Sequence, residues 1–157
     1  MVSPELLRQY PLFASFDDHE LKAISALADE VTVEAGTTLF EAGQSAAYFY
    51  LLIEGVVEWH YDMVNPTSSE LRKDVHILDY SPGEPFGISA LLETHLYLGR
   101  ADVRSRSRLL RMDGPRLRAL CELDTGMGPV LLRAITAAAM ERLTKMRALM
   151  AAARSEP

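Results

Sequence analysis

The chain has 157 residues, of which 48% are hydrophobic and 24% are charged, and these values are typical of a soluble globular protein. Its formal net charge is −6, which does not favour binding along a nucleic-acid backbone, and its single cysteine, Cys121, excludes an intramolecular disulfide. The sequence lacks an apolar run of the roughly 20 residues that span a bilayer, and residues 1–5 lack the pattern of a secretory signal. We therefore expect one cytoplasmic domain over residues 1–157, without a membrane segment.

Two helix starts stand near the beginning of the chain. Ser3 followed by Pro4 is typical of an N-cap and a first helical residue. Asp17, with Glu20 three residues later, has the spacing of a capping box. We therefore predict N-terminal helices over residues 1–29.

From residue 30 to residue 112, short β-prone pieces alternate with glycine turns. The run 47–54 is apolar apart from its tyrosine hydroxyls and its last residue, which suits a strand covered on both faces, and Gly55 separates it from a hairpin partner over 56–61. Two more strands are expected between Leu96 and Met112. The pattern predicts a mainly β (α+β) fold, an eight-stranded β-roll or jelly roll between N-terminal helices and a long C-terminal helix.

The region 113–157 is expected to be helical. Asp113-Gly114-Pro115 starts a short helix, and the stretch 127–152 has no proline or glycine after Pro129, so it should form one long helix. A broad apolar stripe on this helix can pack on the body and still leave surface for a partner. The stripe that we expect to lie at a dimer interface consists of Ile135, Ala139, Leu143, Met146 and Met150.

Four glycine-bearing or closing segments follow one another in a recognisable order. They are 33–43 (VEAGTTLFEAG), 48–57 (YFYLLIEGVV), 82–92 (PGEPFGISALL) and 101–103 (ADV). Together they resemble the cyclic nucleotide-binding domains of the catabolite-activator (CRP/FNR-type) family over nearly the whole chain. The resemblance implies a phosphate-binding cassette at the third segment and a last helix that pairs with its twofold mate in a homodimer.

Two positions depart from the pattern that this resemblance implies. The family places an acidic residue after the Phe-Gly pair, for the ribose hydroxyl, and an arginine four residues before the closing valine, for the cyclic phosphate. These positions hold Ile88 and Gly99. Arg100 is adjacent, but side chains alternate along a strand, so it faces outward if Ala101 faces inward, unless a β-bulge intervenes. Two absent hydrogen bonds to charged groups would remove about 3–6 kcal/mol, or roughly two to four decades of affinity.

The cassette has a second interpretation that rests on its backbone. A glycine turn followed by a short helix leaves N–H groups unpaired at the helix start, which favours an anion, although the glycines could equally serve only to permit a tight turn. We expect any anion to contact the N–H groups of Gly87, Ile88, Ser89 and Ala90. The candidate ligand-binding residues are Gly83, Phe86, Gly87, Ile88, Ser89, Ala90, Gly99, Arg100 and Ala101.

Other classes of protein fit less well. A cupin-like metal enzyme needs two histidines one residue apart on a strand, and His19, His60, His76 and His95 offer no such pair, so we expect surface or hydrogen-bonded histidines and no metal. His76 or His95 could serve as an axial ligand in a haem-sensing relative. Ser89 lacks a nucleophile elbow, and Cys121 is expected to be a packing residue. A regulator that reads DNA would need a helix-turn-helix after the last helix, so this chain alone is not expected to bind nucleic acid.

The sequence thus predicts a regulatory sensor module and not an enzyme. We expect it to bind a small anionic ligand or a protein partner, with weak or lost binding of cyclic AMP or cyclic GMP and no other cofactor, and to signal through a dimerising last helix. The alternatives are a true cyclic-AMP-binding effector domain of a transcriptional regulator and the cupin-like enzyme.

Overall fold

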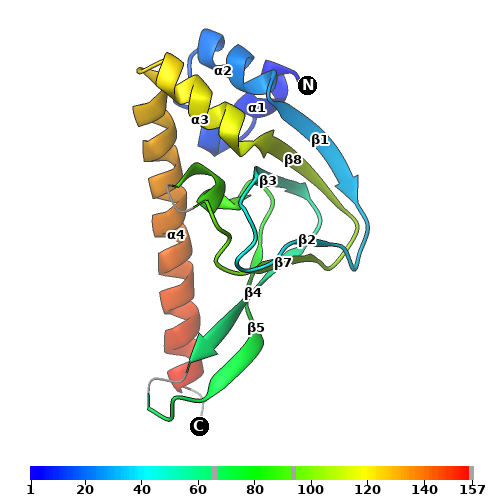
Figure 1. The fold of residues 1–157 in the computed structure, drawn as a ribbon, viewed down its shortest axis with the longest axis vertical. Coiled ribbons are helices and arrows are strands. Elements are labelled where there is room, and N and C mark those ends of the chain that lie inside the picture. The colour runs from blue at the N-terminus through cyan, green and yellow to red at the C-terminus, as the bar shows by residue number, and fades with distance from the viewer. Residues whose placement is uncertain (65–66, 93–94, 156–157) are drawn as a thin grey trace.

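The computed structural model describes residues 1–64, 67–92 and 95–155. Its eight strands form two antiparallel four-stranded sheets, in the orders β1-β8-β3-β6 and β2-β7-β4-β5 (Figure 1), which confirms the expected β-roll. The strands are β1 (Ala28–Val33), β2 (Thr38–Phe40), β3 (Tyr48–Glu54), β4 (Val57–Val64), β5 (Leu71–Tyr80), β6 (Pro85–Phe86), β7 (Arg100–Val103) and β8 (Ser107–Asp113).

The N-terminal helices begin where local capping places them. α1 (Pro4–Arg8) follows Ser3, whose Oγ accepts a hydrogen bond from the N–H of Leu6 at 3.2 Å. α2 (Asp18–Ser25) starts at a complete capping box, in which the N–H of Glu20 donates to Asp17 and the N–H of Asp17 donates to Glu20. Both helices lie at the end of the roll where β1 begins and β8 ends (Figure 1).

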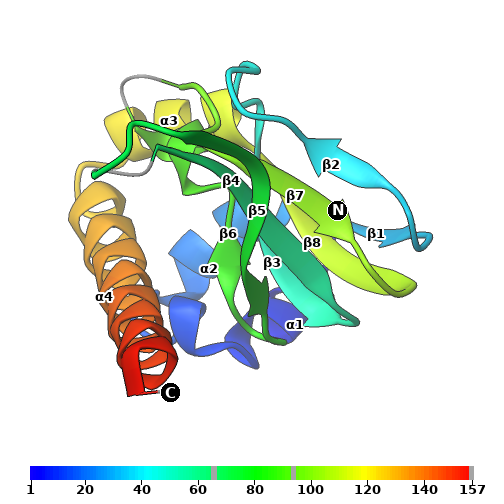
Figure 2. The ribbon, with the colours of Figure 1, turned by 90° about the horizontal axis from the view of Figure 1, so that it is seen from below.

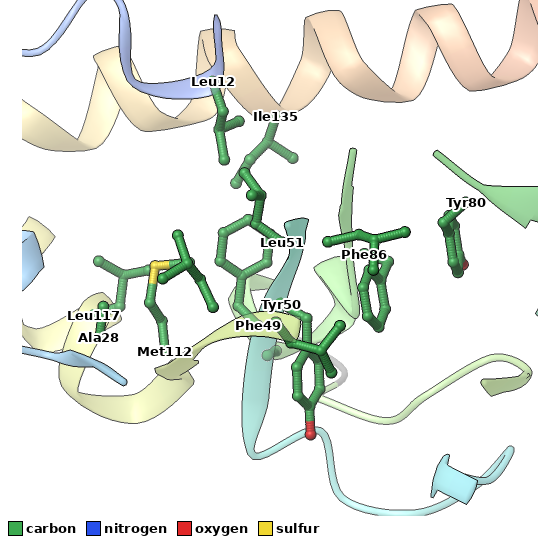
Figure 3. Close-up of a cluster of buried hydrophobic side chains, with 14 of the residues drawn as sticks. Leu12, Ala28, Phe49, Tyr50, Leu51, Tyr80, Phe86, Met112, Leu117 and Ile135 are labelled. Carbon is green, nitrogen blue, oxygen red and sulfur yellow. The ribbon is translucent and has the colours of Figure 1, made fainter. Parts of the chain in front are cut away.

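The core is centred on β3, where four consecutive residues from Phe49 to Leu52 are buried. Side chains alternate along a strand, so one pair faces the roll interior and the other faces the helices. Figure 3 shows Phe49 and Leu51 near Leu12 and Ile135, whereas Tyr50 lies with Phe86. This arrangement confirms the expected strand covered on both faces.

Two helices follow the roll, α3 (Gly114–Leu123) and α4 (Met127–Ser155). Figure 2 shows α4 running along one side of the roll. Its first part is anchored in the core by Met127, Leu131 and Ile135, of which Ile135 is only 7% exposed. In the part of the chain that the structure describes, no helix is long and apolar enough to cross a membrane.

The expected position of Ile135 at a dimer interface is therefore wrong. The sequence places Ile135 in the predicted stripe because it places the polar residues of α4 on the side that faces solvent. In the structure, the side of α4 that faces the body continues from Ile135 to two cationic residues: Lys145 Nζ donates to the carbonyl oxygen of Asp79 at 2.9 Å, and Arg142 donates to the carbonyl oxygen of Pro85. Met146 also packs partly against the core. The exposed apolar side of α4 instead includes Leu132, which is 62% exposed.

Candidate functional site

The turn that resembles the phosphate-binding cassette has its shape fixed by packing. Gly87 has a φ of +68°, and a Cβ there would lie 3.0 Å from the carbonyl oxygen of Tyr48, so the position requires glycine. Phe86, the residue before it, is fully buried, and its ring stacks on those of Tyr50 and Tyr80 at centroid distances of 5.1 and 4.7 Å. Gly83, at a φ of +88°, makes the preceding turn.

A 3₁₀ turn over Ile88–Leu91 follows Gly87 directly. The N–H of Ala90, which we predicted as an anion contact, already donates to the carbonyl oxygen of Gly87 at 3.1 Å, and the Ala90 side chain is fully buried. The first amides of such a turn, at Ile88 and Ser89, have no acceptor within it. The side chain of Ile88 is half-buried against the core and offers no oxygen to a ligand hydroxyl.

The segment 95–97 is joined to the loop before β3. Tyr97 N–H donates to the carbonyl oxygen of Gln44 at 3.0 Å, and Gly43 N–H donates to the carbonyl oxygen of Tyr97 at 2.8 Å. The Tyr97 hydroxyl donates to the carbonyl oxygen of Tyr48 at 2.7 Å and accepts from the N–H of the same residue at 3.1 Å. One buried phenol therefore satisfies both backbone groups of Tyr48.

Gly99 is buried at the position where the resemblance implies an arginine. A Cβ built there would lie 2.5 Å from Nε1 of Trp59 and 2.5 Å from the carbonyl oxygen of His60. Trp59 comes from β4, where it lies opposite Ala101 of β7. The indole therefore covers the inward side of Gly99, and a side chain at this position would need both the indole and the β4 backbone to move.

Arg100 is directed away from the roll interior. The burial of β7 alternates, with Ala101 and Val103 buried and Arg100 and Asp102 partly exposed, and its register with β4 runs without a bulge from Val103 to Arg100. Arg100 Nε donates to Asp102 Oδ2 at 2.8 Å, and its Nη1 lies 2.9 Å from Asp74 Oδ1. The expected alternation is confirmed, and the assignment of Arg100 to the ligand site is wrong for the same reason.

Aromatic rings fill the roll between Gly87 and Gly99. Phe40 stacks on Tyr97 with centroids 3.7 Å apart and planes 10° apart, and Tyr50 lies 6.1 Å from Phe40. Burial raises the pKa of Tyr97 and that of Tyr50, so both phenols are neutral at physiological pH. These rings are uncharged, so they offer a phosphate no ionic partner.

Two hollows lie against α4 rather than inside the roll. One, of about 730 Å³, lies between α4 and the turn 81–85, and its lining includes Arg133, Arg142 and Lys145. The other, of about 240 Å³, is lined by residues that include Leu91, Cys121 and Leu131. Burial raises the pKa of the Cys121 thiol, which keeps it protonated as expected for a packing residue.

The histidines are not all isolated, which corrects the sequence interpretation. His60 of β4 lies opposite His76 of β5, and their ring centroids are 5.3 Å apart. His19 is exposed on α2, and His95 has a φ of +47° in the loop before β7. The sequence separation of His60 and His76 concealed the pair, because only the strand register brings them together.

The fold defines a β-roll domain with helices at both ends. The model of the family described as "cyclic nucleotide-binding domain" matches residues 30–124. A protein of Geobacter metallireducens classed with cyclic nucleotide-binding proteins is 33% identical, with a TM-score of 0.79 over 91% of this chain and 99% of that one. The chain therefore belongs to the cyclic nucleotide-binding domain family.

Other solved structures share the fold. The N-terminal domain of a transcriptional regulator from Streptomyces coelicolor is 26% identical, with a TM-score of 0.64 over 92% of this chain and 94% of that one. The catabolite activator protein of Thermus thermophilus is 19% identical, with a TM-score of 0.65 over 92% of this chain and 63% of that one. No curated protein matches the sequence.

Proposed function

We propose that the chain is a regulatory sensor module of this family whose roll binds cyclic AMP and cyclic GMP weakly or not at all. The observation that carries the proposal is Gly99 beneath Trp59, where a cyclic phosphate would need a cation. Ile88 likewise replaces the oxygen that would receive a ribose hydroxyl. Losing both contacts removes about 3–6 kcal/mol, which is roughly two to four decades of affinity.

We expect the module to act by binding and not by catalysis, and to work in the cytoplasm. Its interior is filled with uncharged aromatic rings, which offer a free phosphate no cation. The transcriptional regulators among the structural neighbours support a regulatory role. A ligand other than a cyclic nucleotide, or a protein partner, would then supply the signal.

The contacts of α4 support signalling through this helix. Arg142 donates to the carbonyl oxygen of Pro85, two residues before Gly87, and its guanidinium lies 4.8 Å from the centre of the Tyr80 ring. Lys145 contacts Asp79 and, at 3.5 Å, Glu84. A change in the conformation of the turn 81–87 would therefore alter contacts of the distal half of α4 directly.

The exposed side of α4 supports a homodimer. Leu143 and Met150 are 40% and 55% exposed, and Leu132 is 62% exposed. These residues belong to a seam spaced alternately by four and three positions, the pattern of a coiled coil. The seam consists of Leu132, Thr136, Ala139, Leu143 and Met150, with the half-buried Met146 at its edge. We propose that two chains pair along it, in an isologous dimer.

The fluorescence of Trp59, the only tryptophan of the chain, reports directly on the space beside Gly99. We expect its emission spectrum to stay unchanged on addition of cyclic AMP up to millimolar concentration. A saturable change at micromolar concentration would contradict the proposal and favour the alternative, a true cyclic-AMP-binding effector domain.

A further inference from the structure

On the outer face of the sheet β2-β7-β4-β5, three side chains with metal-binding atoms converge, and a fourth lies beside one of them. The ligand atoms of Glu58, His76 and Asp79 all lie within 4.8 Å of one another. His60 joins them, because its Nε2 lies 3.1 Å from Oε2 of Glu58. On the neighbouring strand β5, His76 Nε2 lies 2.9 Å from Oδ1 of Asp79. This cluster lies on the face opposite the aromatic interior, so it is separate from the candidate ligand site.

A β-bulge brings these side chains to one face. Glu58 lies opposite Asp79 and Trp59 opposite Leu78, but the register shifts so that His60 lies opposite His76. In a regular strand, residues three apart point to opposite faces, and His76 would be directed away from Asp79. The bulge leaves Ile77 unpaired and turns His76 to the face of Glu58 and His60. Bulges that redirect a side chain in this way are frequent beside functional sites.

The surroundings of His60 favour a cation between its ring and Glu58. Nδ1 of His60 lies 3.3 Å from the carbonyl oxygen of Asp74, which can only accept a hydrogen bond. A neutral ring that donates from Nδ1 has a lone pair at Nε2, and this lone pair faces the Glu58 carboxylate, with Asp102 Oδ2 3.8 Å away. A histidine whose second nitrogen bonds a backbone carbonyl is the usual arrangement of a metal ligand.

The carboxylate of Glu58 is also held in place. Oε1 of Glu58 lies 3.4 Å from Nη1 of Arg104, so Oε2 is the oxygen left to face His60. His60 and Glu58 are 13% and 21% exposed, whereas His76 and Asp79 are 44% and 43% exposed, so the cluster is half open to solvent. An ion could enter from the solvent side without rearrangement of the strands.

We propose that Glu58, His60, His76 and Asp79 bind one divalent transition-metal ion of the zinc type. Imidazole nitrogens and carboxylate oxygens suit zinc, which takes four such ligands at about 2.0–2.2 Å and so separates them by about 3.3 Å. The two nitrogen–oxygen distances of 3.1 and 2.9 Å are already close to that separation. The ion would tie β4 to β5 at the bulge, where the hairpin leaves the body of the roll.

Titration of the untagged protein with Co²⁺ tests this site, because four-coordinate Co²⁺ absorbs visible light. We expect a spectrum that saturates at one ion per chain and is abolished by Zn²⁺ but not by an equal concentration of Mg²⁺, which prefers six oxygen ligands. Zn²⁺ should also raise the Tm of the wild-type protein. Absence of a saturable spectrum would overturn the proposal.

Two variants assign the ligands. His60→Gln and His76→Gln should each weaken Co²⁺ binding by more than about 100-fold, above the range known for loss of an outer-shell partner. His19→Gln, which removes an exposed histidine of α2, is the matched control and should bind as the wild type does. The Tm of each variant without metal shows that it has folded. Wild-type affinity in either folded variant, His60→Gln or His76→Gln, would refute the four-ligand site.

Discussion

Replacing Gly99 by alanine tests whether the interior has room for the side chain that a phosphate site would need. The added Cβ would lie 2.5 Å from Trp59 Nε1 and 2.5 Å from the carbonyl oxygen of His60, which belongs to the paired strand β4 and cannot rotate away. Overpacking of a filled interior costs about 1–3 kcal/mol. For a chain of this length each kcal/mol lowers the Tm by roughly 2–4 °C, so we expect Gly99→Ala to lower it by roughly 2–12 °C.

Thermal unfolding followed by circular dichroism measures this change, and Trp59 emission follows the displaced indole in the same sample. Gly128→Ala is the matched control, because a Cβ there meets its nearest neighbour, Cys121, at 3.7 Å, an ordinary contact in the first turn of α4. We expect the free energy of unfolding of Gly128→Ala to equal that of the wild type or to exceed it by up to about 1 kcal/mol. If Gly99→Ala is as stable as the wild type and leaves the emission unchanged, position 99 has free space and the reasoning about the pocket fails.

Three further substitutions test other parts of the structure. Leu143→Glu should convert a dimer to monomers in analytical ultracentrifugation, whereas Ala148→Glu, which lies off the seam, should not. If both variants remain dimers, this interface is excluded. Tyr97→Phe removes the hydroxyl that bonds both backbone groups of Tyr48, so it should lower the free energy of unfolding by about 1–3 kcal/mol. The control Tyr61→Phe, on an exposed ring, should lower it by less than about 0.5 kcal/mol. Equal losses for the two variants in urea unfolding would refute the role of the Tyr97 hydroxyl. Arg142→Ala should lower the free energy of unfolding by about 1.5–3 kcal/mol and speed amide hydrogen exchange in the distal half of α4. Unchanged exchange would contradict the coupling of this helix to the turn 81–87.

Local signals in the sequence predicted the elements whose causes are local. Ser3 and the Asp17–Glu20 pair form the caps that their spacing indicates, and Tyr48–Glu54 forms the doubly covered strand. Alternation along β7 also predicted the outward direction of Arg100. These inferences needed only neighbouring residues and the period of a strand.

Features set by distant contacts could not be predicted in the same way. β6 has only two residues, Pro85 and Phe86, and exists because they pair with β3. The side of α4 that faces the body was misassigned because Arg142 and Lys145, which the sequence places on a polar side, donate to backbone carbonyls of the roll.

The pairing of His60 with His76 and the cover of Trp59 over Gly99 could not be predicted from the sequence either. His60 and His76 are 16 residues apart and meet only through the register and bulge of β4 and β5. The one local hint was the spacing of Glu58 and His60, which places both side chains on the same face of a strand. That Trp59 covers Gly99 depends likewise on the pairing of β4 with β7.

Calorimetric titration of the wild-type chain with cyclic AMP and with cyclic GMP tests the central claim most directly. The account predicts no saturable heat below millimolar ligand, because Gly99, Ile88 and the outward Arg100 leave the phosphate and the ribose without charged partners. Saturable binding of either nucleotide at micromolar concentration, with one site per chain, would show that backbone donors suffice and would contradict the account.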